Sequence, residues 1–279
     1  MQQLSSQDID LWHVDLADAD WDGLANVLDP DEAGRANSQQ VLFGSQDFGR
    51  SRIALRCVLA SYGDAAPAQL TFRRNAFGKP ALVGQGPFFS LARSRRFALL
   101  AVASTPLGLD LEWVNEWVEE VHLMADLLLH TSERVALDMR APNLRRQVDQ
   151  AWVGKEAYLK WLGTGSRRPL WSFRITSAAS GNLLTIEDSA YTDLPATYVY
   201  PVAVPEGFLS FLCSTIAEPR MRAYHALPGS CLAPDGRIAP GSIRPFAVSV
   251  SPSERPGIER AAAGPGDPGS SPCRLGCAE

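Results

Sequence analysis

Two acidic residues two positions apart, Asp110 and Glu112, lie within the alternating segment LGLDLEWV (residues 107–114). Side chains of a strand alternate between its two faces, so both carboxylates and Gly108 share the face opposite the leucines. Adjacent carboxylates repel unless a cation separates them, and their oxygens suit Mg²⁺, which completes its shell with water or phosphate oxygens. Gly108 would let a ligand approach the backbone. The alternative is an exposed face with two solvated acids.

A second chemical pattern lies in QVDQAWVGKEAYLKWLGTG, which predicts a helix over about residues 147–162. Trp152, Glu156 and Lys160 recur every four residues, so they share one face of that helix. A surface Glu–Lys pair would have the same spacing. However, only three of the chain's 26 cationic residues are lysines, namely Lys79, Lys155 and Lys160. Lysine is a compact, titratable charge where arginine is a permanent fork, so these positions could require lysine.

The elements that must position these residues alternate between strand-like and helix-like stretches over residues 9–218, which predicts an α+β fold. The segment 9–16 alternates like a first strand, and 50–63 repeats apolar residues at helical spacing before Gly63. Residues 97–104 read as a buried strand, which we expect to form a hairpin with 107–114 across Thr105-Pro106.

The last 61 residues differ in composition, since they hold half of the 20 prolines and 8 of the 22 glycines. Such a segment buries too little apolar surface to offset its chain entropy. We therefore expect a disordered tail over 219–279 without catalytic residues.

Charge and composition exclude several classes of protein. The net charge of -5 and the pI of about 5.5 argue against a nucleic-acid partner. No apolar run is long enough to span a bilayer and no signal sequence opens the chain, so we expect a cytoplasmic protein without membrane contact. The five cysteines form no CxxC pair, which argues against a zinc site or a disulfide framework.

The motifs together resemble those of one enzyme family. GLDLE and WVGKEAYLK match the G-x-D-x-E and W-x-x-K-E-x-x-x-K signatures of the surfactin-synthetase type of phosphopantetheinyl transferase, and FGKPAL (residues 77–82) is similar to the family's G-K-P element. The resemblance covers residues 9–218 and places all three lysines on motif positions. It implies transfer of 4'-phosphopantetheine from coenzyme A to a serine of an apo acyl or peptidyl carrier protein, with release of 3',5'-ADP and with Mg²⁺.

The resemblance also implies roles for individual residues. Asp110, Glu112 and Glu156 would hold Mg²⁺, while Lys155 and Lys160 would lie beside the coenzyme A pyrophosphate. The base that accepts the serine proton would be Glu156, one of these lysines or a metal-bound water. Further coenzyme A contacts would come from Lys79, Pro80, Arg56, Ser90 and Arg93, and Glu133 resembles a further family acid.

One segment departs from the family pattern. Where the family has N-[ILV]-S-H-S, this chain has SLARS, with Ser90, Ala92 and Arg93 in place of Asn, Ser and His. Losing the serine removes a phosphate donor, whereas the guanidinium of Arg93 binds phosphate at least as well as imidazole does. We therefore expect Arg93 to contact the nucleotide phosphate. Residues 117–129 form an apolar segment that we expect to be partly core and partly a carrier-docking edge.

The resemblance implies a monomer of two similar, pseudo-symmetric subdomains, 1–106 with the nucleotide contacts and 107–218 with the metal and catalytic motifs. Two other readings remain open at this stage. A degenerate relative would bind coenzyme A or a carrier protein without catalysis, and a different magnesium-dependent phosphoryl enzyme would use the same acids.

Overall fold

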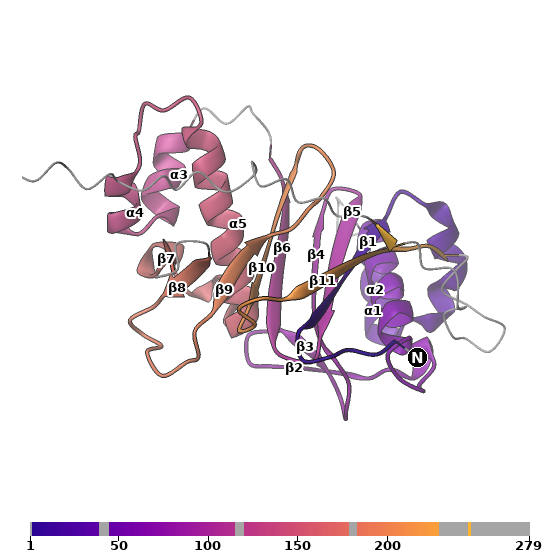
Figure 1. Cartoon of the computed structure of the whole chain (residues 1–279). Coiled ribbons are helices and arrows are strands. Elements are labelled where there is room, and N and C mark those ends of the chain that lie inside the picture. The colour runs from indigo at the N-terminus through magenta and orange to yellow at the C-terminus, as the bar shows by residue number, and fades with distance from the viewer. Residues whose placement is uncertain (1, 39–44, 115–119, 179–182, 229–244, 247–279) are drawn as a thin grey trace, which may run out of the picture.

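The computed structural model describes residues 2–38, 45–114, 120–178, 183–228 and 245–246, and these form a mixed α+β protein. Its strands form two five-stranded sheets and one two-stranded ribbon. Figure 1 shows the strands in the middle of the molecule, with one group of helices at each end. The expected α+β class is therefore confirmed.

The first sheet has the order β12-β11-β1-β5-β4. Its strands are β1 (Asp8–Asp15), β4 (Phe88–Ser94), β5 (Phe97–Ala103), β11 (Arg220–Ala226) and β12 (Pro245–Phe246). β1 is buried on both faces from Asp8 to Val14, and apolar side chains occupy Ile9, Leu11, Trp12 and Val14. It pairs antiparallel with β5 and parallel with β11.

Short helices and the long helix α2 (Ser45–Ala60) cover one face of this sheet. The others are η1 (Ala19–Val27), α1 (Pro30–Ala36) and η2 (Pro67–Gln69). Asp29 and Glu32 form a reciprocal capping box at the start of α1, and Pro30 occupies its first turn. These local features fix where α1 begins, because the side chains satisfy backbone N–H groups that the helix leaves open.

The second sheet has the order β6-β10-β9-β8-β7. It contains β6 (Leu107–Trp113), β7 (Arg174–Ser177), β8 (Leu184–Glu187), β9 (Tyr198–Pro201) and β10 (Phe208–Ser214). The helix α5 (Leu144–Leu162) packs on it and ends at Gly163, whose φ of 78° is the left-handed conformation that favours glycine. α3 (Val121–Leu128), α4 (Thr131–Ala136), η3 (Gly165–Arg167) and η4 (Leu170–Ser172) complete this half.

The sheets meet where the edge strands β4 and β6 run side by side. Leu109 N–H donates to Ser90 Oγ at 2.9 Å and Trp113 N–H donates to Ser94 Oγ at 3.0 Å, so serine hydroxyls take the place of a backbone ladder. An apolar core that includes Leu109, Leu111 and Ala92 fills the space between the sheets. This seam fixes the metal motif on β6 relative to the predicted nucleotide residues on β4.

The ribbon of β2 (Phe72–Arg74) and β3 (Pro80–Leu82) spans the same seam from outside the sheets. Asn75 Nδ2 donates to Gly163 O at 2.8 Å, and Lys79 Nζ donates to Leu107 O and to Trp161 O, each at 3.1 Å. The ribbon thus holds both the beginning of β6 and the end of α5.

Two sequence-based expectations about the fold are wrong. Residues 97–104 and 107–114 do not form a hairpin, because β5 pairs with β1 and β4 while β6 pairs with β10 in the other sheet. Residues 220–226 are not part of a disordered tail, because β11 pairs along its whole length with β1 and buries Ala223 and Ala226. A strand added to an existing sheet obtains backbone partners that its own composition does not reveal. Residues 229–244 and 247–279 lie outside the described part.

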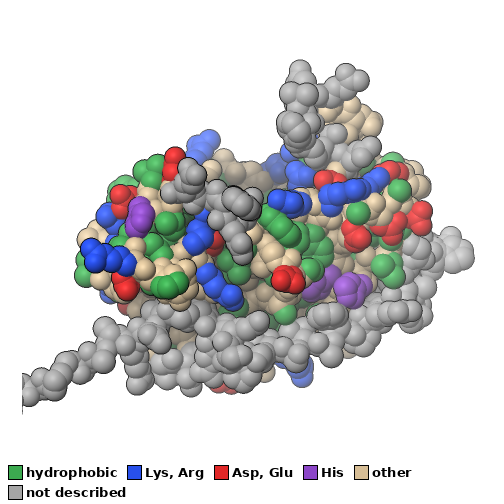
Figure 2. All heavy atoms as spheres, turned by 90° about the horizontal axis from the view of Figure 1, so that it is seen from above, with side chains coloured by type: hydrophobic (Ala, Val, Ile, Leu, Met, Phe, Trp, Pro, Cys, Tyr) green, Lys and Arg blue, Asp and Glu red, His purple; other side chains and the backbone are tan. Residues whose placement is uncertain are grey.

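Figure 2 shows basic and acidic side chains interspersed on one face of the molecule. Within the described residues, no helix combines the length and apolar character needed to cross a membrane.

Gly108 has a packing role that differs from the expected approach of a ligand. A Cβ at this position would lie 2.1 Å from Ala157 O and 2.2 Å from Trp161 N, both in the backbone of α5. Glycine therefore permits direct contact between β6 and the helix that carries Glu156 and Lys160. The expectation that a ligand approaches this position is wrong, because α5 already occupies the space.

We expect Gly108→Ala to lower the free energy of unfolding by about 3 kcal/mol or more, because the new methyl group meets backbone atoms that cannot rotate away. Urea unfolding followed by circular dichroism measures this change. Gly34→Ala is the matched control, since nothing lies within 4 Å of a Cβ there and its helical site tolerates alanine. Equal stability of the two variants would show that β6 and α5 are not in this close contact.

Candidate functional site

Asp110, Glu112 and Glu156 gather where β6 faces α5. The alternation of β6 directs Leu107, Leu109 and Leu111 into the core between the sheets, which leaves the acids on the α5 side as predicted. Lys160 Nζ lies 2.6 Å from Asp110 Oδ1 in a salt bridge. The structure thus brings together the three predicted metal acids and one of the two predicted catalytic lysines.

Burial and neighbouring charge raise the pKa of two carboxyls of this cluster, Glu112 and Glu156. Burial and the charge of Asp110 raise the pKa of Glu112, to which the charge of Glu156 adds. Burial and Asp110 also raise the pKa of Glu156, while Lys160 opposes both shifts. Three partly buried acids therefore share a single nearby lysine, an arrangement that a further cation would stabilise.

One atom of the cluster lacks a partner. Asp110 is 4% exposed, and its Oδ2 atom is buried without a hydrogen bond, although Oδ1 is paired with Lys160. A buried carboxylate oxygen without a partner is costly, so this atom fits a cation ligand. Within the described residues, however, no group of three or more acidic, histidine or cysteine side chains is arranged to hold a metal ion by itself. The oxygen donors fit Mg²⁺ only with further ligands from water or substrate.

Ser94, at the end of β4, positions Glu112. Its hydroxyl donates to Glu112 Oε2 at 3.2 Å and accepts from Trp113 N–H at 3.0 Å. The serine therefore ties the second acid of the motif to the backbone of its own strand.

Lys155 lies elsewhere, which contradicts its predicted position beside a pyrophosphate. Its side chain is completely buried, forms a 2.5 Å salt bridge with Glu133 and donates to the carbonyl oxygens of Leu128, Leu170 and Phe173. The five-residue spacing from Lys160 explains the difference, because it directs the two lysines to different sides of α5. In this structure Lys155 and Glu133 connect α5 to the segments around α4 and η4.

Arg56 is also buried inside the protein, where a ligand cannot reach it. The guanidinium is 0% exposed and bonds Glu32, Asp29 and the carbonyl oxygens of Pro67 and Leu70. These partners use four of its five donors and the side chain is fully buried, so the predicted coenzyme A contact is wrong for this structure. Arg56 joins α2 to the capping box of α1 instead.

A cationic cleft of about 350 Å³ opens beside Lys160. It is bounded by α1, α2, β4, the β2–β3 ribbon and the end of α5. Its cationic lining residues are Arg35, Arg52, Arg74, Lys79, Arg93 and Lys160, and among the described residues no acidic side chain lines it. Such a cleft is electrostatically suited to a polyanion. Because Lys160 both lines the cleft and pairs with Asp110, the cleft leads directly to the acid cluster.

The predicted nucleotide contacts Lys79, Pro80, Ser90 and Arg93 all line this cleft. Lys79 is also a structural residue, since two carbonyl oxygens accept from its ammonium and burial lowers its pKa to about 8. An ammonium has three donors, so one remains for a ligand. Ser90 Oγ accepts from the backbone of Leu109, so it joins the strands as well.

Arg93 lies over the ring of Phe48, 5.5 Å from its centre, and Arg35 lies over the same ring at 4.3 Å. Sequence analysis missed Phe48, Arg35 and Arg52 as cleft residues. The four-residue spacing of Phe48 and Arg52 places them on one face of α2 and was the available signal. The contribution of Arg35 comes from another helix, and no local pattern indicates it.

Ala92, the other departure from the family pattern, does not face the cleft. It is 2% exposed and packs in the apolar core between the two sheets with Ile9 and Leu99. A hydroxyl at this position would enter an apolar environment here. The alanine therefore leaves the lining of the cleft unchanged.

Comparisons with known proteins agree with this geometry. The family model of the 4'-phosphopantetheinyl transferase superfamily matches residues 106–200, which include β6 and α5. The chain is 30% identical over 169 residues to 4'-phosphopantetheinyl transferase HetI of Nostoc sp. (strain PCC 7120), covering 58% of this chain and 71% of the relative. It is 27% identical over 150 residues to 4'-phosphopantetheinyl transferase gsp of Aneurinibacillus migulanus, covering 53% of this chain and 60% of that relative.

We expect Lys155→Met to lower the free energy of unfolding by about 3–5 kcal/mol, because it leaves the Glu133 carboxylate without its cation. Urea unfolding measures the loss. Arg146→Met, which removes an exposed cation of the same helix, is expected to cost much less.

The double variant Lys155→Met/Glu133→Gln tests the cause of the loss. It should regain part of the lost stability, because no charge remains buried without a partner. A Lys155→Met protein with wild-type stability and abolished turnover would instead show that Lys155 acts on the substrate.

Proposed function

This chain belongs to the 4'-phosphopantetheinyl transferase superfamily and is an enzyme that transfers phosphopantetheine to carrier proteins; we propose that it does so with magnesium held at Asp110, Glu112 and Glu156. The proposal rests most directly on Lys160, which lines the cationic cleft and pairs with Asp110. One side chain thereby joins a polyanion site to an acid cluster.

We place the nucleotide part of coenzyme A in the cationic cleft. Coenzyme A carries a 3'-phosphate and a pyrophosphate, and six cationic side chains line the cleft, of which Arg52 is paired with Glu32 and Lys160 with Asp110. Arg93 and Arg35 flank Phe48 at its edge; burial lowers the pKa of Arg93, the charge of Asp47 opposes this shift, and the charge of Arg35 adds to it. A phosphate between these guanidinium groups would relieve their repulsion.

The oxygen donors of Asp110, Glu112 and Glu156 would hold the metal ion, with the unpartnered Asp110 Oδ2 as its first ligand. Bound Mg²⁺ would neutralise charge on the pyrophosphate and orient it for in-line displacement. Lys160 then exchanges its pairing with Asp110 for the phosphate oxygens. Ser94 holds Glu112 in place during this exchange.

The carrier serine Oγ attacks the β-phosphorus of coenzyme A, the bond to the leaving phosphate oxygen breaks, and 3',5'-ADP departs with the electron pair. Within the cluster, the Glu156 carboxylate accepts the serine proton, because the Lys160 ammonium, paired with Asp110, has no lone pair to take it. The pKa of Glu156 is raised toward neutral pH, which makes its carboxylate a stronger base and suits a general base. Lys155 has no part in this step.

We further propose the surfactin-synthetase type of the family, a monomer with two similar halves divided near residue 106. Each half has a sheet and one long helix, α2 or α5, which supports this division, although β11 and β12 from beyond residue 219 complete the sheet of the first half. Carrier proteins would dock at α3, where Leu123 and Leu127 are 51% and 59% exposed while Ala125 is buried. Val118 of the predicted docking segment lies outside the described residues.

A non-catalytic relative that only binds coenzyme A is the second candidate, because Ala92 and Arg93 depart from the family pattern. The placement of Ala92 in the core and of Arg93 in the cleft argues against it. The intact cluster of Asp110, Glu112, Glu156 and Lys160 favours turnover.

We expect an apo carrier domain incubated with the protein, coenzyme A and Mg²⁺ to gain the mass of one phosphopantetheine on its serine. Intact-mass spectrometry measures the gain. Removing Mg²⁺ with a chelator, or replacing Asp110 by Asn, should abolish it, because both changes remove charge neutralisation at the pyrophosphate. Coenzyme A binding without any gain would establish the binding module.

We expect Arg93→Ala to raise the KM for coenzyme A about tenfold or more while changing kcat little, because a charge-assisted phosphate contact is lost from substrate binding. Steady-state rates at varied coenzyme A measure both constants. Arg146→Ala, at an exposed position outside the cleft, is the control. An unchanged KM would place the nucleotide elsewhere.

A further inference from the structure

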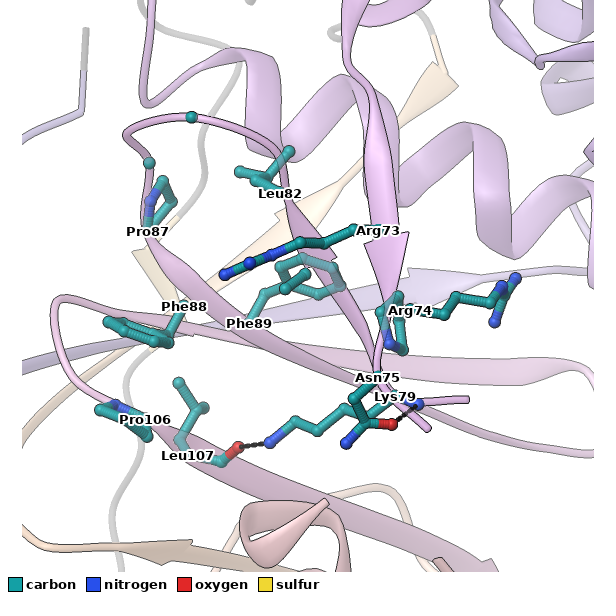
Figure 3. Close-up of a pocket in the computed structure, with 14 residues that line it drawn as sticks. Arg73, Arg74, Asn75, Lys79, Leu82, Pro87, Phe88, Phe89, Pro106 and Leu107 are labelled. Carbon is teal, nitrogen blue, oxygen red and sulfur yellow. Dashed lines mark hydrogen bonds between the residues drawn. The ribbon is translucent and has the colours of Figure 1, made fainter. Parts of the chain in front are cut away.

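A second cavity lies on the other side of the β2–β3 ribbon from the cationic cleft. Its volume is about 470 Å³, which is within the range of small-molecule sites. The proposed transfer reaction uses none of its apolar walls. Figure 3 shows the cavity between the ribbon, the beginning of β4 and the turn that leads into β6.

The polar lining that the structure describes is basic or neutral. Arg73, Arg74 and Lys79 line the cavity, and no acidic side chain of the described part of the chain does, although the net charge of the chain is -5. Within the described residues, the Arg73 guanidinium has neither a hydrogen bond nor a salt bridge, whereas Arg74 donates to Gly78 O. Figure 3 shows the Arg73 side chain extending toward Pro87 and Phe88. Arg73 thus offers a planar, two-pronged donor to an anion.

The other walls are apolar and partly open to water. Leu82, Pro87, Phe88 and Pro106 contribute to them, and Phe88 is 46% exposed despite its size. An exposed ring beside an arginine without a partner suits a ligand with an apolar body and one anionic group. Neither an all-apolar ligand nor a polyphosphate would use both parts of the lining.

The cavity is distinct from the cationic cleft but shares a wall with it. Lys79 and Arg74 line both, and the Lys79 ammonium is held by Leu107 O and Trp161 O between them. Arg93 and Lys160 line only the cleft, whereas Arg73 and Phe88 line only this cavity. The residues that differ allow each space to be tested alone.

We propose that this cavity binds a small amphipathic anion, with a carboxylate, sulfonate or phosphate on Arg73 and an apolar body against Phe88 and Leu82. The site is separate from the coenzyme A site and is adjacent to the ribbon that holds β6 and α5.

The experiment is a fluorescence titration of the full chain with anilinonaphthalene sulfonate, an amphipathic anion that brightens in apolar surroundings. We expect saturable binding that Arg73→Gln weakens about tenfold through loss of a charged hydrogen bond. Arg73→Lys should retain part of the affinity, and Phe88→Ser should weaken binding by a similar factor through loss of an apolar wall. Saturating coenzyme A should leave the probe bound.

Matched controls separate the site from general effects. Arg146→Gln removes an exposed arginine outside the cavity, and Val83→Ser removes an apolar side chain that is 55% exposed and does not line it. Both should leave the affinity for the probe unchanged, and thermal unfolding confirms that each variant is folded.

Three results would overturn the proposal. They are absence of saturable binding, equal affinity in Arg73→Gln and Arg146→Gln, and competitive displacement of the probe by coenzyme A, which would place it in the cleft. If coenzyme A does not bind at all, the proposed function fails while the variant series still decides on the cavity.

Discussion

The arrangement of the site depends on a seam between two edge strands that share no backbone ladder. Ser90 and Ser94 of β4 accept the N–H groups of Leu109 and Trp113 of β6, four residues apart on both strands. Unpaired edge groups are costly when buried, so these hydroxyls stabilise a junction that an apolar core alone would leave free to slide. Between the serines, Arg93 faces the cleft while β6 presents its acids to α5.

The second constraint is the mutual repulsion of the carboxylates. Asp110, Glu112 and Glu156 are close enough to raise pKa values in the cluster, and Lys160 is the lysine that opposes the shifts. The protein maintains this unfavourable arrangement because β6 and α5 are fixed by the close contact at Gly108 and by the ribbon residues Asn75 and Lys79. A bound cation would relieve this repulsion.

The lysines illustrate why a motif is not a site. All three occupy motif positions, yet Lys160 lies in the acid cluster, Lys79 holds the ends of two elements and Lys155 is buried against Glu133. The scarcity of lysine thus singled out three positions that the structure uses in three different ways.

The sequence by itself determined the mixed fold class, the strand 107–113 with its two acids on one face and the helix carrying Glu156 and Lys160, because alternation and helical spacing are local properties. It also determined the family, because the two motifs are contiguous stretches of sequence. Only the tertiary structure decided that β5 and β6 belong to different sheets and that β11 extends the first sheet. It also decided that the buried Arg56 guanidinium pairs with Glu32 and Asp29. It also brought Arg35 and Phe48 to the cleft beside Arg93. Such pairings join residues that are distant in the chain. A local sequence pattern does not specify which distant residue completes a hydrogen bond or neutralises a charge.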